Sequence, residues 1–246
     1  MKRLWDLAFK KQTTVGSAAM VLAFMVLLSR VLGLIRDRLL STYFAPEELG
    51  VYFAAFRIPN VIFELLVMGA LTAAFIPVYT KYLSENREHD AERLATVLIN
   101  LSVMILAIVS IPLFILAPWI SRLLAPGFNE LQIVEMSTYT RFILLFQVAP
   151  LLVGNVLTGI LQSHSLFLIP AAAPVLYNIG IIIGTVALSS VWGLWGPVVG
   201  VGIGAVLFVA IQIPLILRLG YRHTLEINPT LPGVREVGRL MGPRTL

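Results

Sequence analysis

Six long apolar runs dominate the chain, and shorter polar or charged segments separate them. A bilayer core ~30 Å thick needs ~20 predominantly apolar residues in a helix that crosses it. Strands of a membrane barrel would instead alternate apolar and polar positions over about ten residues, whereas these runs are continuous. The pattern therefore predicts an all-α integral membrane protein with six transmembrane helices, at residues 15–44, 51–79, 95–116, 139–161, 166–191 and 194–217.

The polar segments complete this outline. A charged loop is expected at residues 80–94, and a longer loop at residues 117–138. After a turn at residues 228–233, the spacing predicts an amphipathic helix at the cytoplasmic interface, with an apolar face made of Val234, Val237, Leu240 and Met241. We expect three regions: a basic cytoplasmic N-terminus (1–14), a six-helix transmembrane lobe (15–220) and a cytoplasmic interfacial segment (221–246) that leads to a second lobe.

Composition and charge support a membrane protein. Hydrophobic residues make up 58% of the chain and charged residues only 13%, against ~25% charged residues in soluble domains, which excludes a soluble or disordered chain. The net charge of +5 does not indicate a nucleic-acid partner, because lysines and arginines gather at the ends of the apolar runs. Most of them lie in the N-terminus, the 80–94 loop and the tail, which predicts both termini in the cytoplasm.

Chemistry of other kinds is not expected. The chain has no cysteine, which excludes disulfides and thiolate metal sites. It contains no HExxH, P-loop or GxSxG motif, so we expect no enzyme activity, no cofactor and no metal. In the sixth span, the glycines of Gly200-Val201-Gly202-Ile203-Gly204 predict close helix packing. Uncharged polar residues such as Asn178 are expected to bond across helices.

Ionisable residues within the first span are candidates for function, because charges at membrane depth cost several kcal/mol. The span contains Arg30, Arg36 and Asp37. Arg30 and Asp37 are seven residues apart and share a helix face, whereas Arg36 lies off that face. Gly33 between them permits close packing or a local bend.

The second span carries a polar stripe. Arg57, Asn60 and Glu64 follow the i, i+3, i+7 spacing of one helix face, and such a face must contact protein or water rather than lipid. Pro59 removes a backbone donor and predicts a kink. Two interpretations remain open: the stripe binds the second span to the first, for example through Glu64 with Arg30 or Arg36, or it lines a hydrated cavity.

Several segments resemble those of the MurJ (MviN) lipid II flippase family, which belongs to the multidrug/oligosaccharidyl-lipid/polysaccharide (MOP) exporter superfamily. These segments are SRVLGLIRD (29–37), FAAFRIPN (53–60), GALTAAFIPV (69–78), APGF (125–128), IPAAAP (169–174) with Asn178, and MGP (241–243). The resemblance covers nearly the whole chain in order, and implies the six-helix N-terminal lobe of a MOP-type transporter with two such lobes around a central cavity.

The resemblance also implies an activity. Members move the lipid-linked peptidoglycan precursor, lipid II, from the inner to the outer leaflet of the bacterial cytoplasmic membrane by alternating access. It implies that Arg30, Arg36 and Arg57 face the substrate, whose pyrophosphate suits the planar fork of arginine, and that Asp37 and Glu64 pair with or orient them. The expected partners are lipid II or a related polyprenyl-pyrophosphate-linked saccharide, membrane lipids, and a second lobe in the same or another chain.

The chain departs from the family pattern at four positions. Members usually have an acidic residue at the position of Gly50, an arginine pair at Phe63 and Glu64, and a glutamate at Met68. The expected cavity is therefore less positive, and phosphate recognition depends on that field. Two alternatives follow: a non-transporting membrane assembly partner derived from the flippase, or a MOP-type exporter of another lipid-linked saccharide. A cation-coupled drug exporter of the same superfamily fits the motifs less well.

Overall fold

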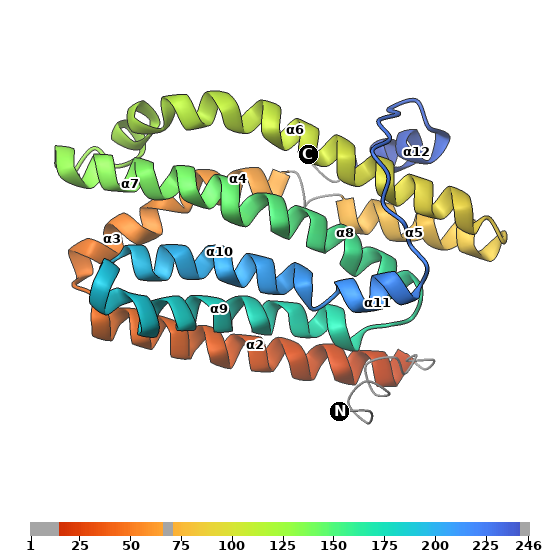
Figure 1. Cartoon of the computed structure of the whole chain (residues 1–246), viewed down its shortest axis with the longest axis horizontal. Helices are drawn as coiled ribbons and strands as arrows, with labels where there is room; N and C mark the ends of the chain where they lie inside the picture. The colour runs from red at the N-terminus through yellow and green to blue at the C-terminus, as the bar shows by residue number, and fades with distance from the viewer. Residues whose placement is uncertain (1–14, 66–70, 242–246) are drawn as a thin grey trace.

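The computed structural model describes residues 15–65 and 71–241, and all regular structure within these ranges is helical (Figure 1). The predicted N-terminal region 1–14 and the position of Met68 lie outside them. In chain order the helices are α2 (Val15–Tyr43), α3 (Pro46–Ala55), α4 (Arg57–Phe63), α5 (Leu71–Ser84), α6 (Glu88–Leu124), α7 (Glu130–Ile143), the π-helical η2 (Leu144–Val148), α8 (Ala149–Ser163), α9 (Leu168–Trp192), α10 (Trp195–Ala210), α11 (Ile213–Arg218) and α12 (Pro232–Met241).

The all-helical prediction is confirmed, and five of the predicted spans are long helical segments. Among the described residues, five such segments are long and apolar enough to cross a membrane: Gly16–Tyr43, Glu88–Leu124, Glu130–Ser163, Leu168–Trp192 and Trp195–Arg218. The second predicted span, residues 51–79, is not one continuous helix. Its described parts belong to α3, α4 and α5. That the chain crosses the membrane six times, and that both termini lie in the cytoplasm, stay predictions.

The helices are longer than the apolar runs, so both long predicted loops are wrong. The charged 80–94 segment is mostly helical, since α5 continues to Ser84 and α6 begins at Glu88. Glu88 and Asp90 suit the first turn of α6 because negative charges there interact favourably with the positive end of the helix dipole. The 117–138 segment is helical except around residues 125–129, because Asn129 and Gln132 form a capping box that starts α7.

Close packing of glycines joins α9 to α10. A Cβ atom added to Gly180 would lie 2.3 Å from the Cα of Gly204, and one added to Gly184 would lie 2.4 Å from the Cα of Gly200. Side chains at these positions would keep the two backbones apart. The predicted packing of the sixth span is thus confirmed, and α9 lies between α10 and α2 (Figure 1).

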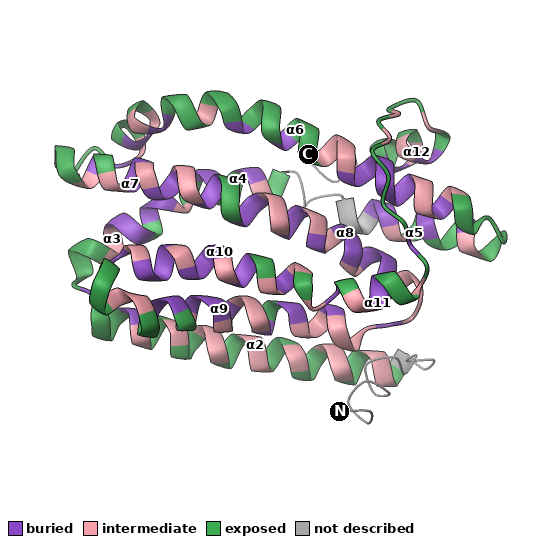
Figure 2. Ribbon diagram, viewed as in Figure 1, coloured by how far each residue is buried: buried purple, intermediate pink, exposed green. Residues whose placement is uncertain are grey.

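The other helices pack around two apolar clusters at opposite ends of the molecule. One cluster joins α5, α6, α8 and α11, with Phe75, Leu94 and Leu161 fully enclosed. The other joins the end of α2 to α3, α7 and α10 around Met136 and Ile143. Large apolar side chains remain exposed along α2 and α6 (Figure 2), as expected for surfaces that face lipid.

The predicted amphipathic helix exists as α12, and it docks on protein. Val237 is fully buried and Val234 packs against the same cluster, in contact with α5 and α6. The apolar face was predicted to include Leu240, but this side chain is exposed. Gly233 explains the close approach, since a Cβ there would lie 2.9 Å from the Tyr82 hydroxyl oxygen.

Candidate functional site

Two adjoining cavities lie along α9. The first, here called the Arg30 cavity, has a volume of about 470 Å³ and lies mainly between α2, α8 and α9. The second, the Arg36 cavity, has a volume of about 410 Å³ and is lined by residues of α2, α3, α4, η2, α8 and α9. Phe63, Leu151 and Tyr177 line both cavities. Most of the lining is apolar, and the arginines that define the cavities come from neighbouring turns of α2.

Arg36 is held in a network that joins α2 to α9. Its Nη2 lies 2.9 Å from Asp37 Oδ1, and its Nη1 donates to Asn178 Oδ1 at 3.0 Å. The amide nitrogen of Asn178 donates in turn to the Ser29 hydroxyl and carbonyl oxygens at 3.1 and 3.3 Å. Since Asn178 is buried, this network fixes the guanidinium at the cavity wall.

The predicted charge pairing of Asp37 is therefore found, but the expected face is different. Asp37 shares a helix face with Arg30, yet it is exposed and is not among the residues that line either cavity. Arg36, which was placed off that face, reaches the cavity because its long side chain turns towards α9.

Arg30 differs from Arg36 in having no fixed partner. It lines its cavity beside Ser29, Asn155 and Thr158, and it makes no hydrogen bond or ion pair with the described part of the chain. The Arg30 cavity therefore presents a guanidinium that is available to an anion, within a mostly apolar wall.

Pro59 kinks the second predicted span, as expected, and the structure shows how the kink is stabilised. Proline has no N–H to donate to the carbonyl four residues earlier, which is that of Ala55. The buried Thr140 hydroxyl donates to this oxygen instead, at 3.0 Å. α3 ends at Ala55 and α4 starts at Arg57, so the kink lies one turn before the proline.

The polar stripe of this span does not converge on one site. Asn60 lines the Arg36 cavity. Arg57 instead donates from Nη1 to the Leu124 carbonyl at 2.7 Å, at the end of α6. Glu64 is exposed and has no ion pair with any described residue, so the predicted pairing of Glu64 with Arg30 or Arg36 is wrong. All three residues belong to α4 or its C-terminal cap, so the kink at its start does not separate them; their side chains reach different neighbours.

No described residue packs closely against Gly33. Nothing lies within 4 Å of a Cβ placed there, and α2 continues through it without a break. The close approach is therefore not found among the described residues, and a local bend stays a prediction. Contact between α2 and α9 is made by Ser29 and Arg36, on either side of it.

Several site residues carried no functional signal in the sequence. Gln147, in the π-helical turn η2, lines the Arg36 cavity, and its buried Oε1 lacks a hydrogen-bond partner within the described residues. π-helical turns occur often at functional sites. Phe63, one of the four departures, lines both cavities, whereas Gly50 lies apart, near the Phe128 ring. No cluster of metal-ligating side chains occurs in residues 15–65 and 71–241.

Known proteins resemble this chain in sequence. A family model described as lipid II flippase MurJ matches residues 39–246. The lipid II flippase MurJ of Burkholderia cenocepacia is 27% identical over 93% of this chain and 46% of its own length. That of Thermosipho africanus is 31% identical over 80% of this chain and 40% of its own length. The chain thus spans about half the length of the curated relatives it matches.

Solved structures agree with the sequence relatives. A lipid II flippase MurJ in an inward closed conformation has a TM-score of 0.73 and 25% identity, over 90% of this chain and 47% of that one. A MATE transporter in complex with MaD3S has the same fold, with a TM-score of 0.71 and 18% identity over 92% of this chain and 50% of that one. With the family model covering most of its length, this chain belongs to the lipid II flippase MurJ family, within the MOP-type transporter fold.

Proposed function

We propose that this chain provides the substrate-binding lobe of a flippase that moves lipid II, or a closely related polyprenyl-pyrophosphate-linked saccharide, across the bacterial cytoplasmic membrane. The observation that carries the proposal is the Arg36 clamp. A guanidinium fixed by Asp37 and Asn178 stands at the wall of an apolar cavity, next to the unpaired Arg30. Because its side chain is already held in place, such a guanidinium loses little conformational entropy when it binds phosphate oxygens.

The two cavities suit the parts of such a substrate. Arg30 and Arg36 can bind the pyrophosphate, and the apolar walls around Leu151 and Phe63 suit the polyprenyl chain. Gln147 Oε1 supplies an unused acceptor for a saccharide hydroxyl. Arg57 is better suited to holding α4 on α6, through its bond to Leu124.

Transport by alternating access needs a second lobe against which this one can move. We propose that it lies in the same polypeptide or in a second one. The charge pattern favours an orientation with the 80–94 segment and the 221–246 tail in the cytoplasm. The activity is transport of an unchanged substrate, so no catalytic residue is assigned.

One observation favours a second candidate, a non-transporting assembly partner. Phe63 occupies the junction of the two cavities, where the family usually has an arginine, and the adjacent Glu64 adds an exposed negative charge. Both changes weaken the attraction of the lobe for a polyanion. Under this alternative, substitutions at Arg30 and Arg36 affect folding or protein contacts alone.

Complementation of flippase-depleted bacteria, with a parallel assay of lipid II translocation, tests the proposal. Arg30→Gln and Arg36→Gln should abolish rescue while the protein still inserts in the membrane. Arg36→Lys should rescue poorly, because an ammonium lacks the planar fork that binds Asp37 and Asn178 together. Arg38→Gln, at an exposed arginine on the same helix outside both cavities, is the matched control and should rescue fully.

Normal growth of both glutamine variants would contradict the proposal. If the unsubstituted protein itself fails to translocate lipid II but still binds other envelope proteins, the assembly partner is the better description.

A further inference from the structure

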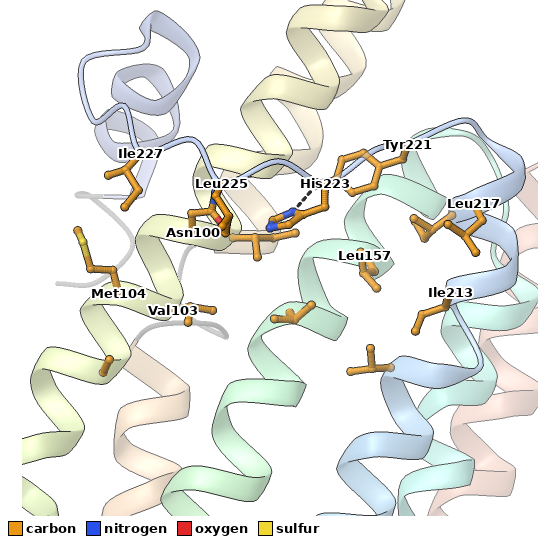
Figure 3. Close-up of a pocket in the computed structure, with 15 residues that line it drawn as sticks. Asn100, Val103, Met104, Leu157, Ile213, Leu217, Tyr221, His223, Leu225 and Ile227 are labelled. Atoms are coloured by element: carbon orange, nitrogen blue, oxygen red, sulfur yellow. Dashed lines mark hydrogen bonds between the residues drawn. The ribbon is translucent and has the colours of Figure 1, made fainter.

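A segment without helix at residues 219–231, here called the strap, connects α11 to α12, and its residues line two pockets, of which Figure 3 shows the apolar one. Side chains alternate across an extended chain. Tyr221, His223, Leu225 and Ile227 line an apolar groove of about 660 Å³. Arg222, Thr224 and Glu226 line a polar pocket of about 170 Å³, together with His89, Glu92 and Arg93 of α6.

The strap is fixed in place by polar contacts with α6. Asn100 Nδ2 donates to the carbonyl oxygens of Thr224 and Glu226, both at 2.8 Å. Arg93 Nε lies 2.8 and 2.9 Å from the two carboxylate oxygens of Glu226, and the Thr96 and Tyr221 hydroxyls are 3.0 Å apart. Apart from the Tyr221 hydroxyl, these contacts use the strap backbone and Glu226, which leaves the apolar side chains of Leu225 and Ile227 free to form the groove wall.

The groove opens on a surface with exposed apolar side chains. Its walls come from α6, α8 and α11, and Met104, Ile213 and Leu217 are accessible at its edge. Its lining along α6 runs from Ile99 to Ala107, roughly 12 Å at the rise of an α-helix. The volume falls within the range of sites that enclose small ligands. Leu225 is 94% exposed, which is unfavourable for a leucine in water and favourable against a hydrocarbon chain.

Arg222 lies in the strap between two residues that line the groove, Tyr221 and His223, and its own side chain lines the polar pocket. Arg222 is exposed and makes no ion pair with any residue the structure describes, whereas the neighbouring Arg93 is paired with Glu226. A chain lying in the groove would bring its headgroup to the strap, where this cation lies on the polar side. An amphipathic protein helix is a poorer occupant, because few polar side chains line the groove.

We propose that the groove is a phospholipid site: one acyl chain of a membrane phospholipid lies between α6 and α11 beneath the strap, and Arg222 binds its phosphate. This inference is independent of the transport proposal, since the groove lies apart from the Arg30 and Arg36 cavities and shares none of their lining residues. The bound lipid would fill the space under the strap and help to hold it, and with it α12, against α6.

Photolabelling of the complete protein in vesicles of phosphatidylethanolamine and phosphatidylglycerol tests the site. The probe is a trace of phosphatidylglycerol with a diazirine on one acyl chain, and adducts are mapped by peptide mass spectrometry. Met104 and Leu225 should be labelled well above Ile111, although Ile111 is 62% exposed and Met104 only 38%. Arg222→Gln should lower the affinity of the groove for the probe roughly tenfold, as expected for loss of a charge-assisted hydrogen bond.

Two phenylalanine substitutions on the same face of α6, one inside the groove and one outside it, test whether the labelling depends on the groove. Ala107→Phe places a ring in the groove and should remove the labelling there. Ile111→Phe, one turn further along α6 and outside the groove, should not. Leu225→Ser cannot disturb the core, because this side chain is almost fully exposed, and it should also reduce labelling.

Three results would overturn the proposal. Equal labelling along the whole exposed face of α6 would mean ordinary annular lipid. Labelling that is unchanged by Arg222→Gln would remove the phosphate contact. Displacement of the probe by a polyprenyl phosphate, but not by added phosphatidylglycerol, would assign the groove to a different lipid.

Discussion

A guanidinium at membrane depth is tolerated only where its N–H groups find acceptors, and Arg36 finds two of different kinds. Asp37 supplies a charge from the adjacent residue, and Asn178 supplies a neutral oxygen from another helix. The depth of Arg36 and Asp37 could be predicted from the apolar residues around them. The contribution of Asn178 could not, because it depends on which helix packs against α2.

Asn178 acts as a positioning residue for Arg36. Asn178→Ala should weaken binding of a lipid-linked pyrophosphate roughly tenfold, by releasing Arg36 Nη1 from its acceptor. Asn178→Gln retains an uncharged amide with an oxygen acceptor and should restore part of the affinity. The measurement is a titration of the purified protein with lipid II, together with its unfolding temperature. Equal affinity for the alanine variant and the unsubstituted protein would remove this role.

Thr140 is expected to matter for stability rather than for binding. Thr140→Val leaves the Ala55 carbonyl, freed by Pro59, without a donor in a buried position, which costs about 1–3 kcal/mol. Chemical unfolding in detergent measures the loss, and Thr140→Ser should largely preserve stability. Thr138→Val, at a partly exposed residue whose hydroxyl bonds within its own helix, serves as control. A similar loss in both valine variants would point to helix propensity instead.

Glu226 should make the strap sensitive to acid. Its hydrogen bond with Arg93 lowers the pKa of this carboxyl below its usual 4.5. A lowered pKa in the docked state means that ionised Glu226 stabilises docking above its ordinary pKa, and that this stabilisation disappears as the pH falls through the lowered value. His89, Glu92 and Arg222 face the same pocket.

Hydrogen exchange of residues 221–227, corrected for the pH dependence of the chemical rate, measures the effect. Exchange should increase on acidification below about pH 4, near the ordinary carboxyl pKa. Glu226→Gln should exchange faster at neutral pH and lose most of this dependence. A strap that exchanges equally at all pH values in both proteins would contradict the assignment.

At the scale of the helices, replacement of glycine by alanine should have opposite effects on stability at two positions. Gly204→Ala forces α9 and α10 apart, since its Cβ would lie 2.4 Å from the Tyr177 carbonyl oxygen, and it should destabilise the protein by about 1–3 kcal/mol. Gly33→Ala meets nothing within 4 Å in α2 and should stabilise it by up to about 1 kcal/mol. Unfolding midpoints of the two variants provide the measurement, and a loss of stability in both would contradict this packing.

Helix boundaries were the least predictable part of the fold. Hydropathy locates the apolar segment, whereas α6 continues beyond it to Glu88 and Leu124, with acidic residues in its first turn and Arg122 in its last turn, where they interact favourably with the helix dipole. The kink of the second span was predictable from Pro59, but the different partners of Arg57 and Asn60 were not. Nor was the donor to the Ala55 carbonyl, because Thr140 lies on a distant helix and has no marked spacing in the sequence.

The molecule as a whole has two kinds of exposed surface. Along α6, exposed side chains are almost all apolar, as at Ile108, Ile111 and Ile115. On the α2–α8–α9 side, Arg30, Asn155 and Thr158 share a cavity that includes a charge without a partner within the described residues. Because a lone guanidinium in hydrocarbon is unfavourable, this second surface must contact water, substrate or another lobe.

Single cysteines distinguish these surfaces cleanly, because the natural chain has none. Asn155→Cys in the Arg30 cavity should react with a charged, membrane-impermeant maleimide, since only a hydrated thiol forms the reactive thiolate. Ile111→Cys should react little, even though the isoleucine is 62% exposed, because lipid covers it. Added polyprenyl pyrophosphate should slow the reaction at residue 155 alone. If residue 155 is inert while residue 111 reacts, the cavity is dry and the assignment of its arginines to a polyanionic substrate fails.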